Sequence, residues 1–125
     1  MNKHEDRAKD YLLHMLDALD AILSYTSGVD QDGFLANRML QDAVVRNIGI
    51  VGEAAKQLLD VAPEFSSKHS EIPFAQVYGM RNRVIHGYAS VDPKVVWDSV
   101  RADVPELRRQ INAVLESLDS SPDKA

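Results

Sequence analysis

The stretch "MRNRVIHGY", residues 80–88, places two arginines, an asparagine, a histidine and a tyrosine within nine positions. A histidine side chain can take up and release a proton near neutral pH. The planar, permanently charged fork of an arginine suits phosphate oxygens. Arg81 and His86, with Asn82 as a neutral donor, therefore carry the groups needed to cleave RNA without a metal ion. The base would deprotonate a ribose 2′-hydroxyl, and the cation would stabilise the charge that builds on the phosphoryl oxygens.

The same side chains also fit a purely structural role. On a helical wheel Arg81 falls within an apolar arc, so it could be an ion-paired anchor, and His86 could be a helix-end histidine stabilised by the helix dipole. Five residues apart, the two side chains point about 140° apart around an ideal helix. Either the helix unwinds before His86, which Gly87 would allow, or groups from two copies of the chain meet in a cleft. The residues alone leave both roles open.

Helical periodicity dominates the rest of the chain and predicts the elements that position this cluster. Apolar residues recur at spacings of three and four, and no segment shows the period-two alternation of a strand. Four helices are expected: from about Ala8 to the loop at residues 24–33, from residues 32–37 to just before Pro63, from about Pro73 to His86, and from Asp92 to Leu118 with a kink or break at Pro105. The prediction is an all-α, up-and-down bundle of four to five helices, with one domain at residues 1–118 and a polar tail at residues 119–125.

The second expected helix contains a glycine pair and an acidic residue in an otherwise apolar segment. Glycine in a helix costs about 1 kcal/mol relative to alanine, so Gly49 and Gly52 predict that another helix approaches very closely. Glu53 would need a cationic partner if it were buried, and Arg46 or Arg81 are the candidates. A structural ion pair and a direct role of Glu53 in the chemistry both remain open.

Composition limits the possible functions. The net charge of −5 argues against a broad nucleic-acid binder but allows a small basic site built from Arg81 and Arg83, with Arg38 and Arg46 as further candidates. The chain has no cysteine and no pair of histidines at metal-binding helical spacing, so no metal site is expected. No apolar run is long enough to cross a membrane and no apolar signal segment opens the chain, which predicts a cytoplasmic protein.

Three segments, "RNIGIVGEAAKQL", "IPFAQVYGMRNRVIHGYASVD" and "VWDSVRADVPEL", resemble in order the HepT-like toxins of the HEPN-domain superfamily. The resemblance extends over about residues 8–118. It implies a homodimeric HEPN bundle whose two motif segments face each other, and a metal-independent endoribonuclease that needs no cofactor. His86 would be the general acid and base and Arg81 the phosphate ligand, while Asn82 and Arg83 would position the RNA. Phe74 stands where the family usually carries tryptophan, a tolerable exchange at a core position.

The resemblance also implies a partner. In a type VII-like toxin–antitoxin pair, a minimal nucleotidyltransferase silences the toxin by transferring AMP from ATP to the motif tyrosine, here Tyr88. A bulky anion there would block the cleft and repel RNA phosphates. The alternative is a non-catalytic subunit that presents Tyr88 and a basic notch to the same nucleotidyltransferase.

Overall fold

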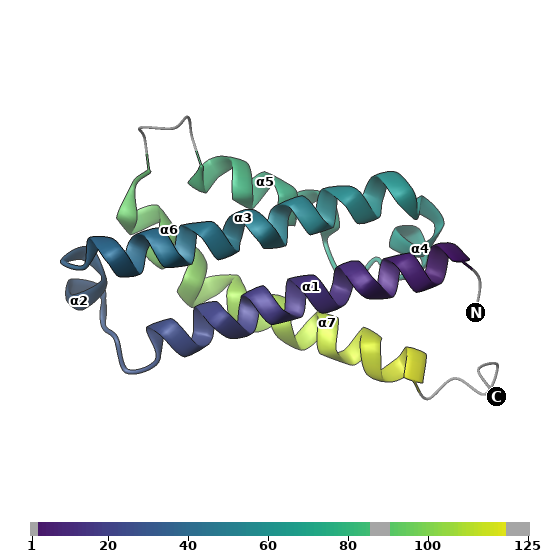
Figure 1. Ribbon diagram of the computed structural model, residues 1–125, viewed down its shortest axis with the longest axis horizontal. Helices are drawn as coiled ribbons and strands as arrows, with labels where there is room; N and C mark the ends of the chain where they lie inside the picture. The colour runs from purple at the N-terminus through teal and green to yellow at the C-terminus, as the bar shows by residue number, and fades with distance from the viewer. Residues whose placement is uncertain (1–2, 86–90, 120–125) are drawn as a thin grey trace.

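Seven helices make up the part of the chain that the computed structural model describes, residues 3–85 and 91–119. They are α1 (Lys3–Thr26), α2 (Gln31–Leu35), α3 (Arg38–Val61), α4 (Pro63–Lys68), α5 (Phe74–Val84), α6 (Pro93–Ala102) and α7 (Val104–Asp119). The long helices α1 and α3 lie side by side in opposite directions, α5 runs back along α3, and α7 packs on α1 (Figure 1). The expected all-α, up-and-down bundle is confirmed.

Side-chain caps start the helices where the sequence pattern predicts. The Asn37 side chain accepts a hydrogen bond of 3.0 Å from the Leu40 backbone N–H at the start of α3. Asp92 accepts one of 2.9 Å from the Lys94 N–H at the start of α6. Proline after the first helical residue is compatible with a helix start, so the break expected at Pro105 becomes the boundary between α6 and α7.

Several predicted boundaries differ from the structure, beginning with α1, which starts at Lys3 and not near Ala8. The expected loop and connector contain the short helices α2 and α4, because Asp30 caps α2 and Pro63 occupies the first turn of α4. The third expected helix, α5, begins at Phe74 and ends at Val84, two residues earlier than predicted. The predicted polar tail begins at Asp119, which is still the last residue of α7, and its other residues lie outside the described part of the chain.

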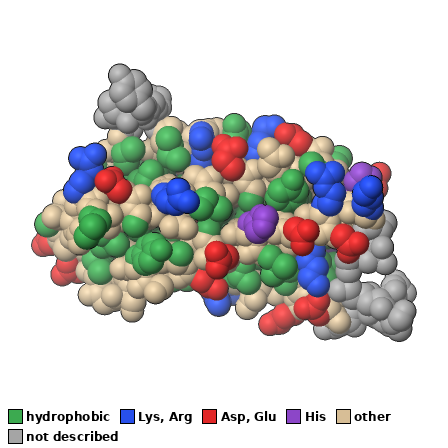
Figure 2. All heavy atoms as spheres, in the orientation of Figure 1, with side chains coloured by type: hydrophobic (Ala, Val, Ile, Leu, Met, Phe, Trp, Pro, Cys, Tyr) green, Lys and Arg blue, Asp and Glu red, His purple; other side chains and the backbone are tan. Residues whose placement is uncertain are grey.

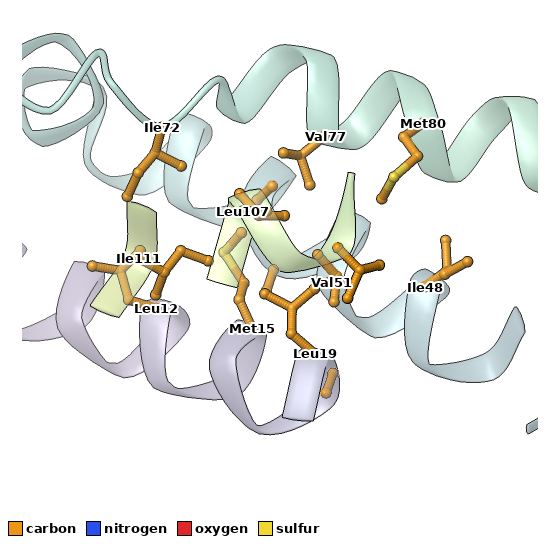
Figure 3. Close-up of a cluster of buried hydrophobic side chains, with 14 of the residues drawn as sticks. Leu12, Met15, Leu19, Ile48, Val51, Ile72, Val77, Met80, Leu107 and Ile111 are labelled. Carbon is orange, nitrogen blue, oxygen red and sulfur yellow. The ribbon is translucent and has the colours of Figure 1, made fainter. Parts of the chain in front are cut away.

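The core lies between α1, α3, α5 and α7, and it fixes how α5 faces α3. Figure 3 shows that side chains from these helices, with Ile72 from the segment before α5, point toward one another. The labelled members are Leu12, Met15, Leu19, Ile48, Val51, Ile72, Val77, Met80, Leu107 and Ile111, all buried. Burial of each large apolar side chain contributes roughly 1.5–3 kcal/mol relative to exposure. Because Val77, Met80 and Val84 point into this core, the neighbouring position 81 lies on the side of α5 that meets α3.

Candidate functional site

Arg81 lies in the last turn of α5, where it reaches the surface of α3. Its side chain is 29% exposed, and its Nε atom lies 3.2 Å from Oε1 of Glu53. Its Nη1 donates a hydrogen bond of 2.9 Å to Oδ1 of the neighbouring Asn82. Arg81, Asn82 and Glu53 are therefore brought together at one place on the α3–α5 contact.

The contact between Arg81 and Glu53 is electrostatic rather than a well-formed hydrogen bond. Nε is buried and has no hydrogen-bond partner in the described structure, although the carboxylate is within ion-pair distance. A buried donor without an acceptor is rare in folded proteins and costs free energy. Holding the guanidinium against α3 therefore costs some free energy of folding. Its direction is set by the packing of the aliphatic part of the side chain as much as by hydrogen bonds.

Gly52 explains how Arg81 can lie so close to α3. A Cβ atom placed on Gly52 would lie 2.2 Å from Cβ and 2.6 Å from Cγ of Arg81. These distances are far below the 3.5–4.0 Å of an ordinary carbon–carbon contact. The close approach that the glycine pair predicts is therefore confirmed at Gly52. At Gly49 a Cβ would meet only Cδ1 of Ile85, at 3.4 Å.

The structure pairs Glu53 with Arg81 and not with Arg46. Arg46 and Glu53 both belong to α3, seven residues or about 10 Å apart along its axis, and no ion pair joins them in the described part of the chain. Arg38 lies at the start of α3 and pairs with Asp42 at 3.1 Å. Of the residues expected to form a basic site, Arg38 and Arg46 do not join Arg81.

Arg83 faces a different part of the molecule. Two residues of a helix are separated by about 200°, so Arg83 points away from α3. It lines a groove of about 400 Å³ between α5 and the α6–α7 junction, together with Met80, Asp103 and Glu106 among others. The sequence already indicated that the two arginines face different ways, because the helical wheel that places Arg81 in the apolar arc places Arg83 outside it.

The end of α5 answers the question of how Arg81 and His86 relate along the helix. Ile85 has non-helical backbone angles, φ −100° and ψ 81°, while its N–H still donates to the Arg81 carbonyl at 2.8 Å. The helix therefore ends before His86, which is the first of the two alternatives left open by the sequence. His86 and Tyr88 lie outside the described residues, so their assigned roles stay predictions.

The other histidines do not bond to Arg81. His4 and His14 are exposed on α1, while His69 packs on the ring of Phe65, with 4.4 Å between ring centres, and partial burial lowers the pKa of its imidazole. None of the three forms a hydrogen bond or ion pair with Arg81 in the described structure. Within residues 3–85 and 91–119 no group of three histidine or acidic side chains is placed to hold a metal ion.

An open, mostly apolar hollow of about 430 Å³ adjoins Glu53 between α1 and α3. Its lining residues are Tyr11, His14, Arg46, Gly49, Ile50, Glu53, Ala54 and Gln57. Figure 2 shows hydrophobic side chains exposed among charged ones on the face that α1 and α3 form. The sequence pattern missed this hollow, because it needs residues from two helices that only the fold brings together. No helix in the described part of the chain has the length and apolarity to span a membrane.

Comparison with known proteins identifies the family. The model of the family described as "Ribonuclease HepT-like" matches residues 15–114. The chain is 32% identical over 108 residues to a "Putative RNase" of Caldanaerobacter subterraneus subsp. tengcongensis, covering 86% of this chain and 94% of that protein. It is 36% identical over 100 residues to the "Probable ribonuclease HepT" of Thermococcus cleftensis, covering 80% of this chain and 88% of that one.

Another relative is longer than this chain. The "Gamma-glutamylcyclotransferase and putative RNase" of Methanocaldococcus jannaschii is 38% identical over 113 residues, which are 90% of this chain but 50% of that protein. The match thus spans about half of that relative's length. No solved structure gives a significant match. The family model matches most of the chain and the two shorter relatives match over most of their length, so the chain belongs to the ribonuclease HepT-like family.

Proposed function

We propose that this chain is a metal-independent endoribonuclease in which Arg81 binds the scissile phosphate and His86 transfers the protons. The proposal rests on the position of Arg81, which lies half-buried against α3 just before α5 ends. The chain that carries this arginine belongs to the ribonuclease HepT-like family. An arginine fork presents several N–H donors to phosphate oxygens. The break in the helix at Ile85 supports the pairing, because His86 need not follow the helical direction that would carry it away from Arg81.

The proposed reaction is a transesterification within the RNA. His86 removes the proton of a ribose 2′-hydroxyl, and the 2′-oxygen forms a bond to the adjacent phosphorus. The bond from phosphorus to the 5′-oxygen of the next nucleotide breaks, and that oxygen takes a proton from an imidazolium. Arg81 stabilises the negative charge on the phosphoryl oxygens during the exchange. The products are a 2′,3′-cyclic phosphate and a free 5′-hydroxyl.

The first test uses a chelator. We expect the purified chain to cleave single-stranded RNA at the same rate with and without excess EDTA, because none of the proposed steps uses a metal ion. End-group analysis of the fragments should find 2′,3′-cyclic phosphate and 5′-hydroxyl ends. A matched oligonucleotide with 2′-deoxyribose throughout is the control and should stay intact. Loss of cleavage in EDTA, with recovery on adding a divalent cation, would overturn the metal-independent mechanism.

The biological setting that we propose is a cytoplasmic toxin–antitoxin pair. A minimal nucleotidyltransferase partner would transfer AMP to Tyr88: the phenol oxygen attacks the α-phosphorus of ATP and pyrophosphate leaves. The resemblance of the motif segment to the HepT-like toxins supports this part of the proposal. Intact mass of the chain, co-expressed with a nucleotidyltransferase encoded beside it, should show the added adenylyl group, and Tyr88→Phe should remove it.

The proposal includes a homodimer, and the hollow between α1 and α3 supports it. Ile50 is 38% exposed in this hollow, and the hollow adjoins Glu53, the ion-pair partner of Arg81. An exposed apolar surface beside a candidate active site is typical of an interface. A second copy that covers this surface would bring two motif segments near each other.

We expect Ile50→Asp to convert the dimer into a monomer and to lower RNA cleavage at least tenfold. A charge buried in an apolar interface without a partner costs several kcal/mol. This cost is about as large as the binding free energy of a modest dimer. Size-exclusion chromatography with light scattering measures the mass. The matched control is Met39→Asp on the same helix, at a position that is 81% exposed, which should remain dimeric and active. A monomeric Ile50→Asp variant that cleaves at the wild-type rate would remove the dimer from the mechanism.

A further inference from the structure

We infer that Glu53 is a positioning residue for the proposed RNA cleavage, which orients the guanidinium of Arg81 from the facing helix. The inference rests on the proposed function and extends it to a residue that the reaction itself does not use. It assigns Glu53 no proton transfer and no contact with RNA. Its role is to fix which edge of Arg81 faces outward.

The contacts of Arg81 with the described residues involve only part of its fork. The guanidinium has five N–H donors in a rigid plane. Its Nε side faces Oε1 of Glu53 at 3.2 Å, and its Nη1 donates to Oδ1 of Asn82 at 2.9 Å. The one hydrogen bond of the guanidinium to another described residue is that of Nη1, so Nη2 forms none within this part of the chain. The side chain is therefore held on two sides, and the remaining terminal donors can meet a phosphate oxygen.

Stability alone does not account for this ion pair. In the single chain the Glu53 side chain is 52% exposed, and ion pairs that solvent reaches contribute little to its stability. The chain nevertheless keeps Gly52 within a helix, beside Glu53, where only glycine lets the stem of Arg81 pass. A long arginine side chain would otherwise sample many rotamers. Holding it in one direction before the substrate arrives lowers the cost of reaching the transition state.

A carboxylate beside a phosphate-binding arginine also has an electrostatic cost, which makes its role measurable. Glu53 places a negative charge near the site and so weakens the attraction of RNA phosphates. Removing that charge should leave KM unchanged or lower it. Removing the orientation of Arg81 should lower kcat. A fall in kcat without a rise in KM is a signature that a merely structural ion pair would not give.

The experiment compares Glu53→Ala and Glu53→Asp with the wild-type chain on one RNA oligonucleotide. We expect Glu53→Ala to lower kcat about 100-fold, the order of loss caused by a misplacement of about 1 Å, with KM unchanged or reduced. Glu53→Asp is one methylene shorter but keeps the carboxylate charge that attracts the guanidinium, so its kcat should stay within about tenfold of wild type. The matched control is Asp60→Ala, which removes an equally exposed acidic partner (54%) from the same helix and should cleave normally.

Each outcome separates this inference from the proposed function. If Glu53→Ala cleaves at the wild-type rate while Arg81→Ala is inactive, the positioning role is wrong and the ribonuclease proposal stands. If the loss in Glu53→Ala follows the fraction of unfolded protein by circular dichroism, or if Glu53→Asp loses as much as Glu53→Ala, Glu53 is not a positioning residue. If the folded wild-type chain and its Asp60→Ala variant both leave RNA intact, the proposed function fails, and the role of Glu53 fails with it.

Discussion

Replacing His86 with alanine is expected to slow RNA cleavage by about 10²- to 10⁴-fold, the usual contribution of general acid–base catalysis. In the proposed mechanism this imidazole removes the proton of the 2′-hydroxyl and supplies the one that the leaving 5′-oxygen takes. Water would have to replace it in both steps. The fold should be unaffected, because α5 already ends at Val84. Initial rates on a labelled oligonucleotide, with a circular dichroism melt of the same sample, measure both quantities.

Two controls make this result specific to proton transfer. His4→Ala removes an exposed histidine from the start of α1 and should cleave at the wild-type rate. Added imidazole should partly restore cleavage by the His86→Ala variant, because a free base can occupy the space and take the proton. A His86→Ala variant that cleaves as fast as wild type would leave Arg81 without its proposed partner and end the assignment.

Much of the fold follows from local physical rules that the sequence displays. Apolar residues at spacings of three and four predict α1 and α3, because only one face of each helix can enter the core. Asn37 and Asp92 start α3 and α6 through hydrogen bonds to backbone N–H groups close by in sequence. Pro105 separates α6 from α7 because proline fits a first helical turn and not a helix interior. These features need no knowledge of the tertiary structure.

The candidate site depends on contacts between helices, and there the sequence was a weaker guide. It offered two partners for Glu53, and the choice of Arg81 over Arg46 follows from how deeply α5 packs on α3 at Gly52. The sequence left the end of α5 open, with unwinding before His86 as one alternative, and the non-helical angles of Ile85 place that end at Val84. Sequence proximity also grouped Arg83 with Arg81, although the helical period turns them to different faces.

Replacing Gly52 with alanine is expected to damage both stability and activity. The added Cβ would lie 2.2 Å from Cβ of Arg81, so α3 and α5 must move apart locally by more than 1 Å. Overpacking of this kind costs about 1–3 kcal/mol of unfolding free energy. Displacing Arg81 by about 1 Å should also slow RNA cleavage by about 10²-fold or more. Urea denaturation and the cleavage rate of the folded fraction measure the two effects separately.

Other glycines in the same two helices provide the matched controls. Gly79→Ala on α5 meets no atom within 4 Å, so it should raise the unfolding free energy by about 0.5–1 kcal/mol through helix propensity alone. Gly49→Ala on α3 adds only an ordinary contact with Ile85, at 3.4 Å, so it should be stabilising by a similar amount. The clash at Gly52 involves Cβ of Arg81, so Gly52→Ala should remain destabilising even when Arg81 is alanine. If Gly52→Ala behaves like Gly79→Ala, the close approach of α5 to α3 does not exist in solution. The claim that this contact fixes the position of Arg81 is then also wrong.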